Sequence, residues 1–315
     1  MRLHDQHWPR RVPRTLTAPA TSLWDNLETS ARRYPDKVAL QFFGRTISYR
    51  ELADGAQRLA ACLHAAGVQR GDRVIMFMQN MPQLVMAHFA ILRANAVVVP
   101  VNPMNRAQEL QHYITDAGVR LAMTTADLAP ELAQASAALP HEHRLQHMVV
   151  SQVGEYLPPE AEREPVPEAW QAWLTTQHPL PALECGEVLN WQQALACTQP
   201  VPSLEVGPQD LSVLPYTSGT TGLPKGCMHT HASIMCNAMA SAVWGQATSE
   251  NVALAVIPMF HITGMVAMMH AMVYVGGTMV LMPRWDRELA GRWISKYRIT
   301  NWTNIPTMVI DLFAS

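Results

Sequence analysis

Eleven residues, Tyr216 to Gly226, concentrate chemical groups that could hold a chain of phosphates. The segment contains three glycines, four serine or threonine hydroxyls and one lysine. Glycine lets a backbone turn tightly and approach a ligand closely. Backbone N–H groups, hydroxyls and an ammonium group together suit a polyphosphate. The candidate phosphate-binding residues are Thr217, Ser218, Gly219, Thr220, Thr221, Gly222 and Lys225.

The spacing of this segment is not that of the P-loop nucleoside triphosphatases. Their fingerprint, Gly-x-x-x-x-Gly-Lys, is followed by Ser or Thr, whereas Gly226 follows Lys225 here. Composition alone also allows a plain Gly/Ser/Thr turn that binds nothing. The choice between the two interpretations depends on the rest of the chain.

The elements that must position this segment alternate between strand and helix. The run 96–101 is apolar throughout, which is typical of parallel strands covered on both faces. Thr230 precedes a helical pattern over 231–244 as an N-cap, and Ser48 with Glu51 forms a capping-box pattern. The sequence therefore predicts an α/β fold with mainly parallel sheets covered by helices on both faces.

We expect three parts along the chain. A loose N-terminal arm covers 1–20, a first α/β subdomain covers 21–202, and a second, truncated α/β subdomain with the phosphate loop covers 203–315. Prolines cluster between about 154 and 202, which favours a surface excursion with short helices around 167–174 and 191–196. A linker between independent domains is the alternative.

Composition limits the classes of partner and the compartment. A net charge of −2 gives no electrostatic reason to expect nucleic acid. Five cysteines without a C-x-x-C pair indicate reduced thiols in the cytoplasm. Residues 251–283 carry no charged side chain, but Pro258, His261 and Gly276-Gly277 interrupt them. We therefore expect buried core there rather than a transmembrane span, and leave membrane-surface association open.

The whole string Tyr216-Thr-Ser-Gly-Thr-Thr-Gly-Leu-Pro-Lys-Gly226 resembles the phosphate-binding signature of the adenylate-forming superfamily. That superfamily includes acyl-CoA synthetases, luciferases and peptide-synthetase adenylation domains. Further family landmarks follow in the expected order, at residues 47–52, 71–74, 96–103 and 252–264. One position departs from the pattern, because Asn95 stands where the family usually has Gly. The flanks of the loop look most like those of fatty acyl-CoA ligases.

The resemblance implies a two-step reaction. A carboxylate attacks ATP to give an acyl-adenylate, and coenzyme A then forms the thioester. The loop residues would hold the β- and γ-phosphates, with Lys225 contributing charge and Thr217 contacting Mg²⁺. A single histidine in an apolar segment is more often a core residue, but in the family setting Pro258–Gly264 it gains a role. His261 would orient the carboxylate or gate the path of the thiol, and Phe260, Thr263 and Gly264 would line the same acyl and thiol pocket.

Two alternatives remain open. One is an adenylating enzyme that loads a carrier protein, and the other is a non-catalytic module that binds a nucleotide or an acyl group. Family members are much longer, so we expect an N-terminal fragment that is inactive or nearly so alone. The residues that bind adenine and ribose and form the hinge are expected after Ser315. The sequence does not indicate acyl chain length or oligomeric state.

Overall fold

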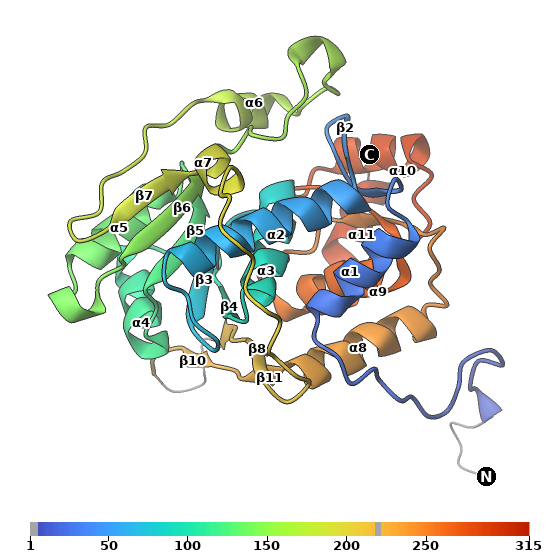
Figure 1. Cartoon of the computed structure of the whole chain (residues 1–315). Coiled ribbons are helices and arrows are strands. Elements are labelled where there is room, and N and C mark those ends of the chain that lie inside the picture. Colours follow the sequence, from blue (N-terminus) through green and yellow to red (C-terminus); the bar gives the residue numbers. More distant parts are fainter. Residues whose placement is uncertain (1–5, 218–221, 315) are drawn as a thin grey trace.

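Two sheets and the helices between them organise the chain (Figure 1). The computed structural model describes residues 6–217 and 222–314. The larger sheet has seven strands in the order β11-β8-β4-β3-β5-β6-β7, all parallel except at β11. Its strands are β3 (Arg73–Phe77), β4 (Val97–Pro100), β5 (Leu121–Thr125), β6 (His147–Ser151), β7 (Glu187–Asn190), β8 (Leu211–Val213) and β11 (His229–Thr230).

The smaller sheet has four strands in the order β12-β13-β1-β2. Its strands are β1 (Val38–Phe42), β2 (Arg45–Ser48), β12 (Val252–Ala255) and β13 (Thr278–Leu281). The hairpin β1–β2 is its antiparallel part. A separate two-stranded hairpin joins β9 (Tyr216–Thr217) to β10 (Lys225–Gly226).

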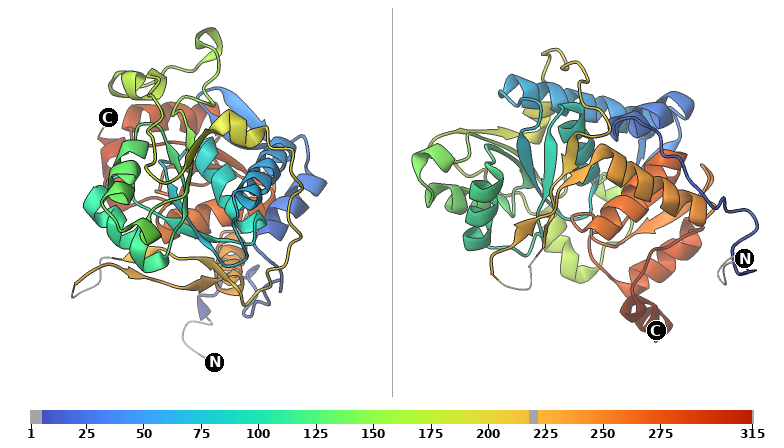
Figure 2. Two further views of the ribbon diagram at one scale, coloured as in Figure 1. Left: turned by 60° about the vertical axis from the view of Figure 1, so that its left-hand side comes forward. Right: turned by 90° about the horizontal axis from the view of Figure 1, so that it is seen from below.

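The helices cover both sheets (Figures 1 and 2). They are α1 (Trp24–Arg33), α2 (Tyr49–Ala65), α3 (Pro82–Arg93), α4 (Ala107–Ala117), α5 (Ala129–Ala137), α6 (Glu168–Thr175), α7 (Trp191–Leu195), α8 (His231–Trp244), α9 (Ala271–Val275), α10 (Arg287–Lys296) and α11 (Pro306–Phe313). A π-helix, Thr263–His270, runs directly into α9. Single 3-10 turns lie at His141–His143 and Glu160–Glu162.

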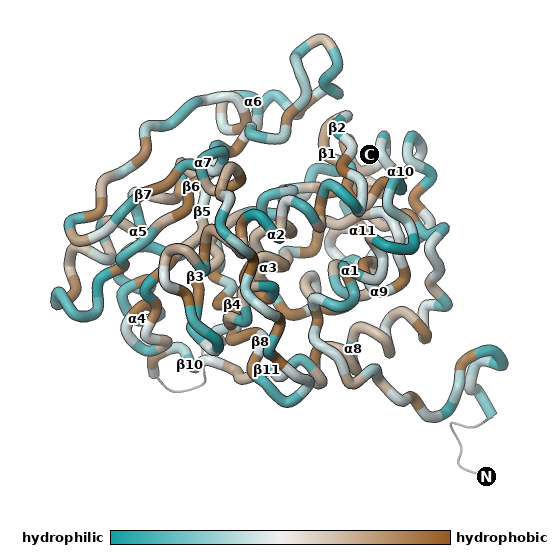
Figure 3. The backbone as a smooth tube through the Cα atoms, in the orientation of Figure 1, coloured by the Kyte–Doolittle hydropathy of each residue, from teal (hydrophilic) through white to brown (hydrophobic). Residues whose placement is uncertain are grey.

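Alternate residues of the central strands pack into two different cores. In β3, Val74 and Met76 join the core that contains α2 and α3, whereas Ile75 and Phe77 join the core that contains α4 and α5. Side chains of a strand point alternately to opposite faces, so both faces of this sheet are buried. Figure 3 shows the hydrophobic stretches along these central strands and hydrophilic stretches in the outer loops. The predicted fold class is confirmed.

The pairing of strands crosses the boundary predicted between residues 202 and 203. Strand β1 pairs with β13, and β8 pairs with β4. Parallel strands are joined by long crossovers, so neighbours in a sheet need not be neighbours in the chain. Each sheet therefore draws strands from both sides of residue 202.

The predicted surface excursion contains a strand that the sequence did not reveal. The expected helices are present as α6 and α7, but Glu187–Asn190 forms β7, the edge strand beside β6. Over these four residues the segment returns to the large sheet. The segment is four residues long and half-exposed, with polar residues at both ends, so it shows no apolar run.

Local signals at helix ends and turns are confirmed. The Ser48 side chain accepts from the Glu51 N–H in a capping box, and the Thr230 side chain accepts from the Ser233 N–H at the start of α8. Asn95 adopts a left-handed backbone (φ 63°), which Gly and Asn accept more readily than other residues. Its side chain also donates to the Ser203 carbonyl (2.7 Å), which explains how Asn replaces Gly there.

No helix among the described residues is both long and apolar enough to cross a membrane.

Candidate functional site

A cavity of about 470 Å³ lies beyond the carboxyl ends of β4 and β8. Three segments line it: 100–102 after β4, 215–217 after β8, and 260–262 in the turn that follows β12. Ligands of open parallel sheets bind outside the carboxyl ends of the strands. The cavity therefore occupies the edge at which this fold places a ligand.

The hairpin β9–β10 holds the two ends of the glycine-rich loop together. Thr217 lies directly opposite Lys225, and both side chains are exposed. Gly222 has φ 117°, a conformation that residues with a Cβ rarely adopt. The other predicted loop residues, Ser218, Gly219, Thr220 and Thr221, lie outside the described residues. Of the predicted phosphate-binding set, the structure thus places Thr217, Gly222 and Lys225 at the base of one loop.

Helix α4 anchors this hairpin from below. The Tyr216 hydroxyl donates to Asp116 (2.6 Å), and its ring packs against Tyr113 with centroids 4.6 Å apart. His112 Nε2 lies 2.7 Å from the Pro224 carbonyl. Burial, joined by the hydrogen bond to Asp116, raises the pKa of Tyr216 above its usual range. Tyr216 therefore stays a neutral donor that fixes the loop base.

The turn after β12 carries His261 to the same cavity. The Pro258 carbonyl accepts from the His261 N–H (3.1 Å), and His261 Nδ1 accepts from the Thr263 N–H (3.2 Å). His261 is exposed, and Phe260 is half-buried beside it. With Nδ1 accepting, the proton of the neutral imidazole lies on Nε2. The exposed ring can then donate from Nε2.

The predicted acyl and thiol pocket is brought together only in part. Phe260 and His261 line the cavity with Thr217, whereas Thr263 and Gly264 are not among its lining residues. A Cβ on Gly264 would collide with the Pro258 carbonyl oxygen. Gly264 therefore permits close packing of the turn against the start of the π-helix.

Several lining residues were missed by the sequence reasoning. Asn105, Glu109 and Tyr113 reach the cavity from α4 and the loop before it, and Cys227 and His229 follow β10. The Asn105 side chain donates to the Tyr113 hydroxyl (3.0 Å). The only available signal was the position of 102–105 directly after a strand that is buried on both faces.

Three other histidines are fully buried near the π-helix. His88 Nε2 and His270 Nε2 lie 2.9 Å apart, and His231 Nδ1 accepts from the Leu23 N–H (3.0 Å). Burial lowers the pKa of His231 to about 4 and that of His270 to about 3. Burial, joined by the neighbouring His270, also lowers the pKa of His88. All three are neutral at physiological pH.

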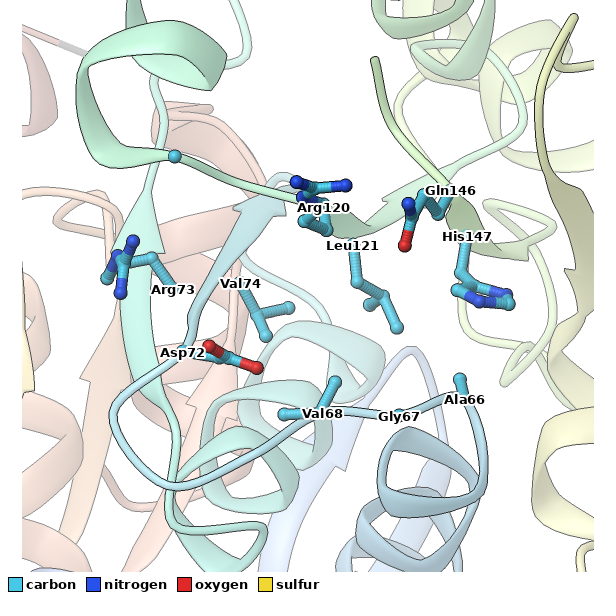
Figure 4. Close-up of a pocket in the computed structure, with 11 residues that line it drawn as sticks. Ala66, Gly67, Val68, Asp72, Arg73, Val74, Arg120, Leu121, Gln146 and His147 are labelled. Carbon is cyan, nitrogen blue, oxygen red and sulfur yellow. The ribbon is translucent and has the colours of Figure 1, made fainter. Parts of the chain in front are cut away.

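A second pocket, of about 230 Å³, lies at the amino ends of the strands of the large sheet (Figure 4). It is lined by the starts of β3, β5 and β6, where Arg73 and Arg120 carry positive charge. Arg73 Nε donates to the Ala117 carbonyl (2.6 Å) at the end of α4. Cations near helix C-termini stabilise the helix dipole, so Arg73 has a structural role at the end of α4.

Comparisons with known proteins agree on one family. The sequence profile of AMP-binding enzymes matches residues 27–315. The chain is 30% identical over 309 residues to a long-chain-fatty-acid–CoA ligase of Bacillus subtilis, covering 97% of this chain and 54% of that protein. It is 31% identical over 280 residues to 4-coumarate–CoA ligase 2 of Oryza sativa, covering 85% and 44%.

The fold is also similar to that of a solved CoA ligase. A crystal structure of a long-chain-fatty-acid–CoA ligase from Archaeoglobus fulgidus superposes with a TM-score of 0.77 at 23% identity, over 98% of this chain and 56% of that one. The chain spans about half the length of the curated relatives it matches. The fold, the glycine-rich loop and the family profile lead to one conclusion: this chain belongs to the AMP-binding enzyme family.

Proposed function

We propose that this chain is part of an ATP-dependent ligase that joins a medium- or long-chain fatty acid to coenzyme A. The observation that carries the proposal is the shared cavity, which places Thr217 at the base of the glycine-rich loop beside Phe260 and His261. The relatives named as fatty-acid and coumarate CoA ligases support the reaction class.

The first step brings two anions together. A carboxylate oxygen attacks the α-phosphorus of ATP, the bond to the bridging oxygen breaks, and pyrophosphate leaves. Lys225 and the loop would neutralise the phosphate charge, and catalysis of this kind consists mainly of positioning and electrostatics. In the second step a thiol sulfur attacks the acyl carbon, the thiol loses its proton, and AMP leaves.

His261 and Phe260 would act on the acyl group. The Nε2–H of His261 can donate to a carboxylate oxygen, which would aim the other oxygen at phosphorus. Phe260 offers an apolar wall beside it. The acid supplies the nucleophile, so no side chain of this set needs to form a covalent bond.

We further propose that a magnesium ion binds beside the phosphates. Mg²⁺ prefers oxygen ligands and is shared with substrate phosphates; when bound it would neutralise charge on the leaving group. The exposed Thr217 hydroxyl, opposite the Lys225 ammonium, is the ligand that we propose.

All five cysteines are free thiols, which supports our placement of the protein in the cytoplasm.

Pyrophosphate release tests the proposal directly. The protein from its intact reading frame is supplied with Mg-ATP and carboxylic acids from acetate to long-chain fatty acids, with and without coenzyme A. We expect release with one class of chain length and thioester formation when coenzyme A is added. If thioester forms only with a carrier protein, the acceptor is a carrier protein and not coenzyme A. If ATP binds but no pyrophosphate is released, the chain belongs to a binding module and not to a ligase.

A further inference from the structure

Asn80 ties the turn that carries His261 to the large sheet. It lies between β3 and α3 and is 2% exposed. Its Nδ2 donates to the carbonyls of Ile257 (3.0 Å) and Ala255 (3.3 Å), and its Oδ1 accepts from the Met259 N–H (2.8 Å). One side chain thus bonds three backbone groups at the end of β12 and the beginning of the turn.

Only an amide satisfies this set of partners. An asparagine side chain has two donor hydrogens and an acceptor oxygen, which match two carbonyls and one N–H. An aspartate of the same shape keeps an acceptor but has no donors, and it sets a negative charge beside two carbonyl oxygens. An alanine leaves all three buried groups without a partner, and each costs free energy.

The turn depends on such backbone contacts for its position. The described hydrogen bonds of the His261 imidazole are confined to the Thr263 N–H, two residues away in the same turn. Nothing in that contact fixes the ring relative to Thr217, because Thr217 follows β8 in the other sheet. Asn80 comes from the loop after β3, and β3 and β8 both flank β4 in that sheet. Asn80 therefore connects the large sheet, which positions Thr217, to the turn after β12, which positions His261.

We propose that Asn80 is a positioning residue that sets the distance between His261 and the phosphate loop. The inference rests on the proposed function, in which His261 and the loop act on one substrate. The alternative is a tie between sheets that contributes to stability alone. Misplacing a catalytic group by about 1 Å can cost about 100-fold in rate, so the two roles predict different kinetics.

Gln83, in the first turn of α3, provides a matched control three residues after Asn80. It is fully buried, and its Nε2 donates to Ser151 Oγ (3.0 Å) and to the carbonyl of Gln152 (3.0 Å). It ties α3 to the end of β6, away from the His261 turn. Gln83→Glu and Asn80→Asp are therefore the same chemical change at equally buried sites, and only one of them touches the turn.

The experiment compares Asn80→Asp and Gln83→Glu in the protein from its intact reading frame. We expect kcat for thioester formation to fall about 100-fold in Asn80→Asp with the KM for ATP unchanged, and Gln83→Glu to keep the parental kcat in its folded fraction. Combined with His261→Ala, Asn80→Asp should lower kcat no further. A parental kcat in folded Asn80→Asp, or equal losses in both variants, overturns the inference.

Hydrogen exchange separates this inference from the proposed function. Amides of residues 256–264 should exchange faster in Asn80→Asp and at the parental rate in Gln83→Glu, whatever the enzyme's substrate. If the parent makes no thioester, the proposed function fails while exchange still reports whether Asn80 holds the turn. Unchanged exchange over 256–264 in Asn80→Asp rejects the inference by itself.

Discussion

His261 and His270 lie at the two ends of one segment and have opposite surroundings. His261 is exposed at the cavity, whereas His270 ends the π-helix fully buried against His88. The first imidazole lines the cavity and is open to a ligand there, whereas the second is shielded from one. The contrast shows that the position of a histidine along the strand, turn and π-helix decides whether its ring is exposed at the cavity or buried in the core.

The largest expected effect comes from removing the exposed imidazole. His261→Ala should lower kcat for thioester formation about 1000-fold, because a preorganised hydrogen-bond donor to a reacting oxygen contributes about 10²- to 10³-fold. The free energy of unfolding should change by less than about 0.5 kcal/mol. Steady-state kinetics and urea unfolding measure the two effects, with the exposed His141→Ala as the control. A fall in stability that accounts for the lost rate would place His261 with the core histidines.

Removing the buried imidazole should have the opposite pattern. His270→Ala should lower the free energy of unfolding by about 3 kcal/mol, since it leaves a cavity and takes the partner from His88 Nε2. Urea unfolding monitored by circular dichroism is the measurement. His88→Ala should cost a similar amount, and the double variant should cost less than the sum because the two residues share one hydrogen bond. Additive losses would show that the pair is not a unit.

Acid should destabilise the protein through the buried histidines. The pKa of each is lowered by burial, to about 3 for His270 and about 4 for His231, against 6.5 in the unfolded chain. Below pH 6.5 the unfolded state therefore binds more protons, and stability falls as pH falls. For each histidine, the free energy of unfolding falls by about 1.4 kcal/mol per pH unit between pH 6.5 and the folded pKa of that histidine.

Urea unfolding at pH 7.5, 6.0 and 5.0 measures that slope. Above pH 6.5 these three groups should contribute no pH dependence. The variant His231→Gln should lower the slope by the contribution of one histidine, about 1.4 kcal/mol per pH unit. A free energy of unfolding that stays constant from pH 7.5 to 5.0 would mean that the buried imidazoles take up protons without cost.

The smallest effect concerns the start of α8, which sets His231 in place. Thr230→Ala removes the side chain that accepts from the Ser233 N–H, and loss of such a cap costs about 1 kcal/mol. Thermal unfolding should register it, whereas Thr230→Ser should stay close to the parent. Equal stability of the alanine and serine variants would show that packing of His231 alone fixes this helix end.

Much of this arrangement was predictable because it is written locally. The capping residues Ser48 and Thr230 bond to backbone only three residues away, so short patterns determine those helix ends. The strands that are buried on both faces are also recognisable, because a run such as 96–101 is apolar throughout. The glycine-rich loop was recognisable from its string of residues.

What could not be predicted depends on contacts between distant residues. Asp116 and His112 anchor the loop base across about a hundred residues, and neither stands in a motif. Strand β7 is stabilised by its place beside β6 rather than by its own composition. The roles of His88 and His270 follow from a contact that no periodicity specifies.

The pairing of β1 with β13 has a consequence for synthesis of the protein on the ribosome. Leu40 is bonded in the sheet to Met279, so the apolar strand β1 leaves the ribosome long before its partner exists. At typical translation rates the delay is on the order of 10–50 s. Throughout that interval Ala39, Leu40 and Phe42, all fully buried in the finished fold, have no sheet partner on one side. Until residue 281 has emerged, this strand edge therefore stays unpaired, and unpaired apolar edges of that kind favour aggregation.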